Sequence, residues 1–175
     1  KGKFIKCNLL NHRKLNKIFK IIKPDLVIHL AAQSTVNEKI RWIDYYENNV
    51  KATKNILDIL KILKIKKLIF SSTASVYKEK KTKISEIDKL KPSSKYGKSK
   101  LIAENLIRKH KSINYIILRF FNVCSALRKP LIGEFHNPET HLLPVSITKL
   151  FNNQIIKIFG KDYKSKDGTC ERDYI

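Results

Sequence analysis

At 175 residues and 42% hydrophobic content, the chain is long enough to form one domain with a substantial core. Its three cysteines (Cys7, Cys124 and Cys170) are odd in number and scattered, which fits reduced thiols rather than a disulfide framework or a zinc site. No apolar run approaches the roughly 20 residues that span a bilayer, and no signal peptide opens the chain. We therefore expect a cytoplasmic protein without membrane contact.

The formal net charge of +22 raises the question of nucleic-acid binding. Most of the positive residues are lysines, which spread over the polar faces of the expected helices, while arginines are scarce and unclustered. Arginine is the residue preferred for bidentate phosphate recognition. The pattern indicates solvated charge, so we expect no specific nucleic-acid partner, only non-specific adhesion at low salt.

Apolar periodicity and turn residues predict an alternation of strands and helices along the chain. The expected strands are residues 4–8, 26–32, 66–71, 115–119 and 155–159. The expected helices are residues 11–22, 40–63, 96 to about 111, and 142–151. This order predicts an α/β fold, a doubly wound parallel sheet with right-handed crossovers and helices on both faces. The run 26–32 is continuously apolar, as in a strand buried on both faces.

Ligands of such sheets bind beyond the carboxyl ends of the strands. Three expected strands deliver candidate residues to that edge, in the segments 31–32, 71–73 and 121–122. Their convergence is stronger support for a site than any single motif.

Tyr96 and Lys100 stand four residues apart on an expected helix, and therefore on one face of it. A neighbouring cation favours the phenolate, so the tyrosine could act as a base, and a hydroxyl of the strand-end triplet Ser71-Ser72-Thr73 could complete a proton relay. Tyr77 and Lys81 have the same spacing, but they lead into a polar stretch without periodicity that reads as a loop. The alternative interpretation of Tyr96 is an ordinary surface tyrosine.

Two histidine-containing features have plainer explanations. His29, within an apolar run, is expected to be a hydrogen-bonded interior imidazole. Two histidines and two glutamates lie within residues 134–141, but Pro138 interrupts their spacing and no His-Glu-x-x-His pattern occurs. We therefore expect an irregular loop there and no metal.

Seven segments together resemble the extended short-chain dehydrogenase/reductase family, and within it the UDP-glucose 4-epimerases, over essentially the whole chain. They are residues 29–32, 45–50, 70–77, 96–100, 119–122, 138–144 and 167–175. The resemblance implies a Rossmann-like NAD-binding domain in residues 1–122 and the start of a substrate-binding region in 123–175. It also implies interconversion of UDP-glucose and UDP-galactose in galactose metabolism, and a homodimer when the protein is complete.

In this resemblance Tyr96 is the base that takes the proton of the sugar 4-hydroxyl, Lys100 holds the nicotinamide ribose and lowers the pKa of Tyr96, and Thr73 hydrogen-bonds the reacting oxygen. NAD accepts a hydride from C4 and returns it to the other face of the 4-keto sugar. Besides these three residues, the implied NAD contacts are Asn8, Leu9, Leu30, Ala31, Ala32, Ser34, Asn49 and Phe121. The other implied substrate contacts are Asn122, His141, Leu142, Phe159 and Arg172.

Several positions depart from the family pattern. Asn8 replaces an aspartate at the adenine-binding strand end, and Ser34 stands where some epimerases have a lysine. Ala74 and Ser75 replace the Asp-Glu pair of related dehydratases, which disfavours dehydration because neither can exchange protons near neutral pH.

The sequence contains neither methionine nor the family's Gly-x-x-Gly-x-x-Gly loop. We therefore expect an internal piece of the enzyme that alone binds NAD weakly or not at all and does not turn over. The alternatives are another NAD-dependent nucleotide-sugar epimerase, acting for instance on UDP-glucuronate or an N-acetylated sugar, and a non-catalytic basic remnant.

Overall fold

The computed structural model describes residues 2–129, 132–133, 136 and 139–175. It divides into two units, Lys1–Phe120 and Phe121–Ile175, which are described one at a time. The domain boundary expected after residue 122 lies close to this division and stays a prediction.

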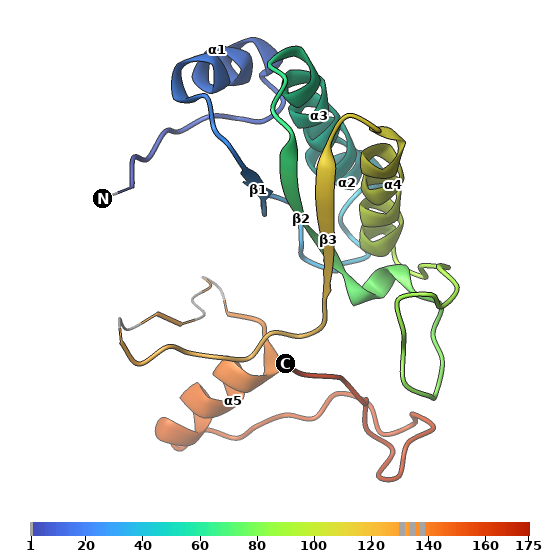
Figure 1. Cartoon of the computed structure of the whole chain (residues 1–175). Helices are drawn as coiled ribbons and strands as arrows, with labels where there is room; N and C mark the ends of the chain where they lie inside the picture. Colours follow the sequence, from blue (N-terminus) through green and yellow to red (C-terminus); the bar gives the residue numbers. More distant parts are fainter. Residues whose placement is uncertain (1, 130–131, 134–135, 137–138) are drawn as a thin grey trace. The chain divides into compact units, whose positions relative to one another are not determined.

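The first unit is built on three parallel strands in the order β1-β2-β3, seen side by side in Figure 1. They are β1 (Val27–His29), β2 (Lys67–Thr73) and β3 (Asn114–Phe120). His29 pairs with Phe70, and Thr73 pairs with Phe120. The carboxyl ends of the strands therefore lie at one edge, and the predicted parallel α/β sheet is confirmed.

In this unit a helix precedes each strand, and the helical segments between the strands form the crossovers of the parallel sheet. The helical segments of the unit are α1 (His12–Ile22), α2 (Trp42–Tyr45), the π-helix η1 (Tyr46–Lys51), α3 (Ala52–Ile62), the 3₁₀ turn η2 (Ala74–Val76) and α4 (Lys95–Lys109). The helix predicted at 40–63 is thus one helical run with a π-helical segment in its middle.

The core of this unit lies between one face of the sheet and its helices. Its members are buried side chains of α1, α3, β2 and α4: Leu15, Ile56, Leu57, Ile59, Leu60, Leu68, Phe70, Ala103 and Ile107, among others. Successive strand residues point to opposite faces, and on the other face Ile28 and Ile116 are each 56% exposed. The prediction that 26–32 is a strand buried on both faces is therefore wrong within this unit, because none of its described residues covers that second face.

Two further predicted strands are absent from the described structure. Residues 4–8 and 155–159 have no regular secondary structure, and Phe4 and Phe159 are 89% and 84% exposed. A strand needs a neighbour to satisfy its backbone hydrogen bonds, and these segments pair with no strand among the residues described. Their apolar content alone was therefore not enough to predict a strand.

The second unit contains the predicted helix, α5 (Leu142–Phe151). Its other regular contacts are two isolated bridges, a parallel one between Asn122 and Tyr174 and an antiparallel one between Leu127 and Ile132. Of the loop expected at 134–141, residues 134–135 and 137–138 lie outside the described residues.

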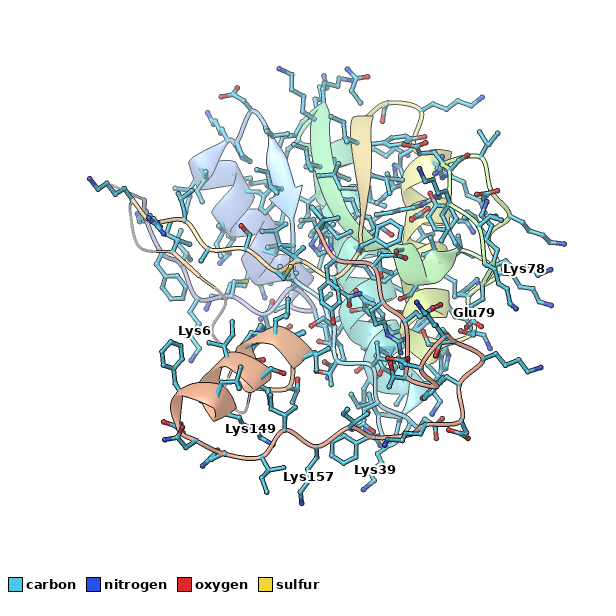
Figure 2. The ribbon with its side chains drawn as sticks, turned by 90° about the horizontal axis from the view of Figure 1, so that it is seen from below. Lys6, Lys39, Lys78, Glu79, Lys149 and Lys157 are labelled. Atoms are coloured by element: carbon cyan, nitrogen blue, oxygen red, sulfur yellow. The ribbon has the colours of Figure 1, made fainter. Side chains whose placement is uncertain are left out.

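Lysines supply most of the charged surface. Lys39, Lys78 and Lys157 are exposed, and Figure 2 shows their side chains extending away from the ribbon. This is the arrangement expected for solvated charge. Among the described helices, none has the length and apolar character needed to cross a membrane.

Candidate active site

The Tyr96 helix begins where the sequence predicts. Ser94 is its N-cap, and the Ser94 side chain accepts a hydrogen bond from the backbone N–H of Gly97 at 3.0 Å. Tyr96 therefore lies in the first turn of α4, and Lys100 follows one turn later. The Lys100 side chain is only 2% exposed, and its ammonium lies 4.3 Å from the centre of the Phe70 ring.

Thr73 ends β2 beside this turn of the helix. Its hydroxyl accepts a hydrogen bond from the backbone N–H of Ser75 at 3.2 Å, which starts the turn η2. The Thr73 side chain lies close enough to Tyr96 to influence the pKa of the phenol. The strand end and the first turn of the helix thus place Thr73 beside Tyr96, and the joint catalytic role of the two residues stays a prediction.

The electrostatics of Tyr96 differ from the expectation. Burial raises the pKa of Tyr96 above its usual 10.0, the Thr73 side chain opposes this rise, and Tyr45, whose ring centre is 6.4 Å away, adds to it. Burial lowers the pKa of Lys100 to about 8. The expected lowering of the Tyr96 pKa by Lys100 is not seen, because desolvation outweighs the other influences on the phenol.

Gly97 lets the helix approach the turn after Thr73. A Cβ atom at this position would lie 2.4 Å from the carbonyl oxygen of Ser75, closer than side chains pack. Glycine is thus required here for space and not for its backbone angles.

Asn49 connects the loop after β1 to the Tyr96 helix. Its Oδ1 accepts from the backbone N–H of Gln33 at 2.8 Å, and its Nδ2 donates to the Gln33 carbonyl at 3.1 Å and to Ser99 Oγ at 2.8 Å. Ser99 in turn donates to the carbonyl of Tyr96 at 2.7 Å. Asn49 is 1% exposed, so this expected NAD-site residue uses both amide hydrogens to hold the loop in place.

His29 is the satisfied interior imidazole that we expected. Thr53 donates its hydroxyl to the Asn49 carbonyl at 2.6 Å, so His29 Nε2, 2.9 Å from the same hydroxyl oxygen, must carry the proton of their hydrogen bond. Burial, and then the charge of Lys100, lower the pKa of His29 to about 4. The ring is therefore neutral at neutral pH.

The remaining expected NAD contacts of the first unit lie at two places. Leu30, Ala31, Ala32 and Ser34 follow β1 at its carboxyl end, where Leu30 is 67% exposed. Asn8 and Leu9 precede α1, and the Leu9 carbonyl accepts from Asn55 Nδ2 of α3 at 2.9 Å. Their contacts with a cofactor stay predictions.

The other expected substrate residues, together with Phe121, belong to the second unit. Asn122 pairs with the final residues: its Nδ2 donates to the Asp173 carbonyl at 2.8 Å. Leu142 opens α5, while Phe159 and Arg172 are exposed, with Arg172 Nη1 donating to the Glu171 carbonyl at 2.7 Å. Their relation to Tyr96 remains a prediction.

His136, Glu139 and His141 lie close together in the same unit. Their potential ligand atoms are within 4.8 Å of one another. Glu139 accepts hydrogen bonds from the backbone N–H groups of Thr140 and His141 at 2.7 and 2.9 Å, and its Oε1 is 3.0 Å from His141 Nδ1. These internal contacts account for the cluster, and the expectation of no metal stays a prediction.

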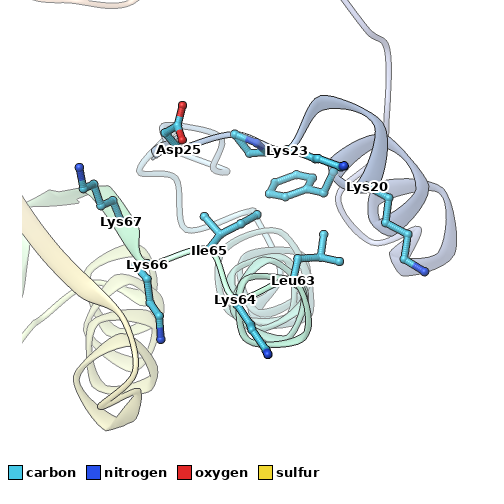
Figure 3. Close-up of a pocket in the computed structure, with 10 residues that line it drawn as sticks. Lys20, Lys23, Asp25, Leu63, Lys64, Ile65, Lys66 and Lys67 are labelled. Carbon is cyan, nitrogen blue, oxygen red and sulfur yellow. The ribbon is translucent and has the colours of Figure 1, made fainter.

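A pocket of about 470 Å³ lies at the opposite ends of the strands (Figure 3). It is lined by Phe19, Lys20, Lys23, Pro24, Asp25, Leu63, Lys64, Ile65, Lys66 and Lys67. Because α1 and α3 both end here, the lysines complement the negative ends of two helices. The pocket lies at the amino ends of β1 and β2 and is therefore separate from the site around Tyr96, which lies at the carboxyl end of β2.

Sequence reasoning missed several residues that hold this site. Ser99, Ser72, Glu104 and Arg119 take part in buried hydrogen bonds around it. The one sequence signal was Arg119 itself, a charged residue inside an otherwise apolar strand.

The site can be compared with known proteins. The family model described as "NAD dependent epimerase/dehydratase family" matches residues 1–175. The UDP-glucose 4-epimerase of Halalkalibacterium halodurans is 38% identical over 178 residues, covering 98% of this chain and 53% of that protein. The chain thus spans about half the length of the curated relatives it matches.

Solved structures agree in fold. The UDP-glucose 4-epimerase of Brucella ovis in complex with NAD has a TM-score of 0.89 and 34% identity, covering 99% of this chain and 55% of that one. The Bifidobacterium longum enzyme in complex with NAD⁺ and UDP has a TM-score of 0.86 and 31% identity, covering 98% and 54%. The chain belongs to the NAD dependent epimerase/dehydratase family.

Proposed function

We propose that the intact protein containing this chain is an NAD-dependent UDP-glucose 4-epimerase, which interconverts UDP-glucose and UDP-galactose. The observation that carries the proposal is the half-buried Tyr96, which lies beside Thr73 at a strand end and is followed one turn later by the buried Lys100. Family membership and the names of the relatives support it.

The residues present fit the cofactor. Small and exposed apolar side chains after β1 lie at the same sheet edge as Thr73, the edge where ligands of such sheets bind. We propose that NAD is held by Asn8, Leu9, Leu30, Ala31, Ala32, Ser34, Asn49, Thr73, Tyr96, Lys100 and Phe121. When bound, NAD supplies the acceptor, and later the donor, of the hydrogen at sugar C4.

The chain's own residues handle the proton. Tyr96 takes the proton of the 4-hydroxyl as base and returns it as acid, and Thr73 orients both oxygens by hydrogen bonding. Lys100 brings a positive charge into a buried position, where it can hold the ribose hydroxyls. Ala74 and Ser75 offer no acid–base pair, so a 4-keto sugar in this site keeps its hydroxyl groups.

We assign sugar-nucleotide contacts to Asn122, His141, Leu142, Phe159 and Arg172, the last as a cation for the diphosphate. The expected homodimer and cytoplasmic location stay predictions. A different nucleotide-sugar, such as UDP-glucuronate, would use the same proton chemistry and differ in pocket shape.

The test is Tyr96→Phe in the intact protein. We expect epimerisation of UDP-galactose to fall by about 10²- to 10⁴-fold, the usual contribution of a positioned acid–base group, while bound NAD persists. Tyr115→Phe is the matched control, since Tyr115 lies on β3, 36% exposed. A wild-type rate in Tyr96→Phe would reject the base assignment.

The choice of sugar is tested in the same assay. Turnover of UDP-glucuronate or an N-acetylated sugar, but not UDP-galactose, would replace the proposed substrate. An intact protein that binds NAD but turns over none of them would support the non-catalytic alternative.

A further inference from the structure

Glu104 is a buried carboxylate that the proposed chemistry does not use. It lies on α4 one turn beyond Lys100 and is 0% exposed. Its Oε1 accepts from the Ser72 hydroxyl at 2.5 Å and from Arg119 Nε at 3.0 Å, and its Oε2 accepts from Arg119 Nη2 at 2.7 Å. Burying such a pair is costly and often gives no net stability, which directs attention to what the carboxylate does for its neighbours.

The contacts of Glu104 join three elements at the candidate site. Glu104 belongs to α4, Ser72 to β2 and Arg119 to β3. Ser72 is the residue immediately before Thr73, so the carboxylate ties the Tyr96 helix to the strand position next to the threonine hydroxyl.

Arg119 is itself fixed from its other side. Its Nη1 donates to the Tyr77 hydroxyl at 2.8 Å, and its guanidinium carbon lies 4.7 Å from the centre of the Tyr77 ring. Tyr77 directly follows η2, the turn that begins at Thr73. The network therefore contacts the end of β2 through Ser72 and the turn after it through Tyr77.

Glu104 also sets the charge environment of Lys100. The two side chains are four residues apart and share a helix face. Burial lowers the pKa of Lys100, and the negative charge of Glu104 opposes this effect. The other groups facing Lys100 are the neutral His29 of β1, the uncharged Tyr96 of α4 and the Phe70 ring of β2.

The charges facing Glu104 are cationic. Arg119 neutralises it from β3, and Arg108, 47% exposed, lies 3.6 Å away on α4. Arg119 would therefore lose the carboxylate that neutralises it if Glu104 were replaced by a neutral residue.

We propose that Glu104 is a positioning residue that fixes α4 against β2 and β3 through Ser72 and Arg119 and keeps the buried Lys100 protonated. The catalytic meaning of this arrangement rests on the proposed function of Tyr96 and Lys100. The effect of Glu104 on the protonation of Lys100 does not depend on that function and can be measured without it.

The test is the titration of Lys100 in the protein without NAD or sugar. Lysines are labelled at ¹³Cε and followed by NMR against pH, and Lys100 is identified by the signal missing from Lys100→Met. In wild type we expect a midpoint of about 8. Glu104→Gln should lower it by about one pH unit or more, because the anion that opposes the effect of burial on Lys100 is lost.

Two further variants separate charge from structure. In Glu104→Gln/Arg119→Met both members of the ion pair are gone, so no unpaired charge is left behind, and the midpoint should still lie below that of wild type because Glu104 is absent. Arg108→Gln removes an exposed contact to the same carboxylate and should leave the midpoint close to wild type.

A folded Glu104→Gln with the wild-type midpoint would reject the proposal. If that variant does not fold, the double variant decides, since a midpoint at or above wild type contradicts the role of Glu104. Because neither readout needs turnover, this result is independent of the epimerase assay. In an active protein, Glu104→Gln should also move the alkaline limb of the kcat/KM profile to lower pH.

Discussion

His29 shows how a single side chain can make stability depend on pH without taking part in chemistry. Its ring donates to Thr53 and is buried against Phe70, with ring centres 5.4 Å apart. Charging this ring in the folded state would cost both the burial of a cation and repulsion from Lys100.

The expected consequence is a loss of stability in acid. The pKa of His29 is about 4 in the folded protein and 6.5 as a free group. The unfolded state therefore binds a proton first, so the contribution is complete above pH 6.5 and is lost as the pH falls towards 4. The loss is at most about 3 kcal/mol, from 1.36 kcal/mol per pKa unit.

Urea unfolding at pH 7 and pH 4.5 measures this loss. His29→Gln removes the titrating ring, so its free energy of unfolding should change less between the two pH values than that of wild type. His12→Gln, at the start of α1, is the control and should keep the full change. An equal change in His29→Gln and wild type would show that other groups cause the acid sensitivity.

Among the elements, the contact between α4 and η2 is the tightest constraint on the site. Gly97→Ala should disturb it, because the new Cβ would lie 2.4 Å from the Ser75 carbonyl. Alanine favours a helix by about 1 kcal/mol over glycine, yet we expect net destabilisation and a loss of epimerase activity as Tyr96 moves from Thr73.

Gly133→Ala is the matched control for that prediction. The nearest atom to its new Cβ would be Ala126 Cβ at 3.7 Å, an ordinary contact. Its unfolding free energy should stay within about 0.5 kcal/mol of wild type. A Gly97→Ala protein that is more stable than wild type and fully active would contradict the prediction, because it would mean that η2 can move to accommodate the new Cβ without disturbing the site.

Local signals account for what could be predicted at this scale. Ser94 marks a helix start, and the four-residue spacing of Tyr96 and Lys100 places them on one face whatever packs around them. The Glu104–Arg119 pair was not predictable, since its partners come from different elements and a glutamate on a helix looks the same whether solvated or buried. The strand predicted at residues 155–159 was wrong because an apolar pattern alone cannot show whether a neighbouring strand is there to pair with it.

For the whole molecule, the dominant quantity is the net charge of +22. We expect weak binding to any polyanion, with an affinity that falls linearly with the logarithm of salt concentration. Fluorescence anisotropy with single-stranded DNAs of unrelated sequence at several salt concentrations measures it. Equal affinities are expected, and a strong preference for one sequence that survives high salt would instead indicate a dedicated nucleic-acid site.

The π-helical segment has a consequence for how this region can tolerate change. The N–H of Ala52 bonds to the carbonyl of Glu47, five residues back, so η1 holds one residue more than regular coiling would. Each residue advances an α-helix by about 100°. Deletion of a single residue, such as the exposed Lys51, would therefore rotate Asn49 away from Gln33 and Ser99. This would happen although every residue proposed to take part in the chemistry was still present. In this helical run the angular position of each residue around the helix axis has to be preserved, and not only the residue's identity.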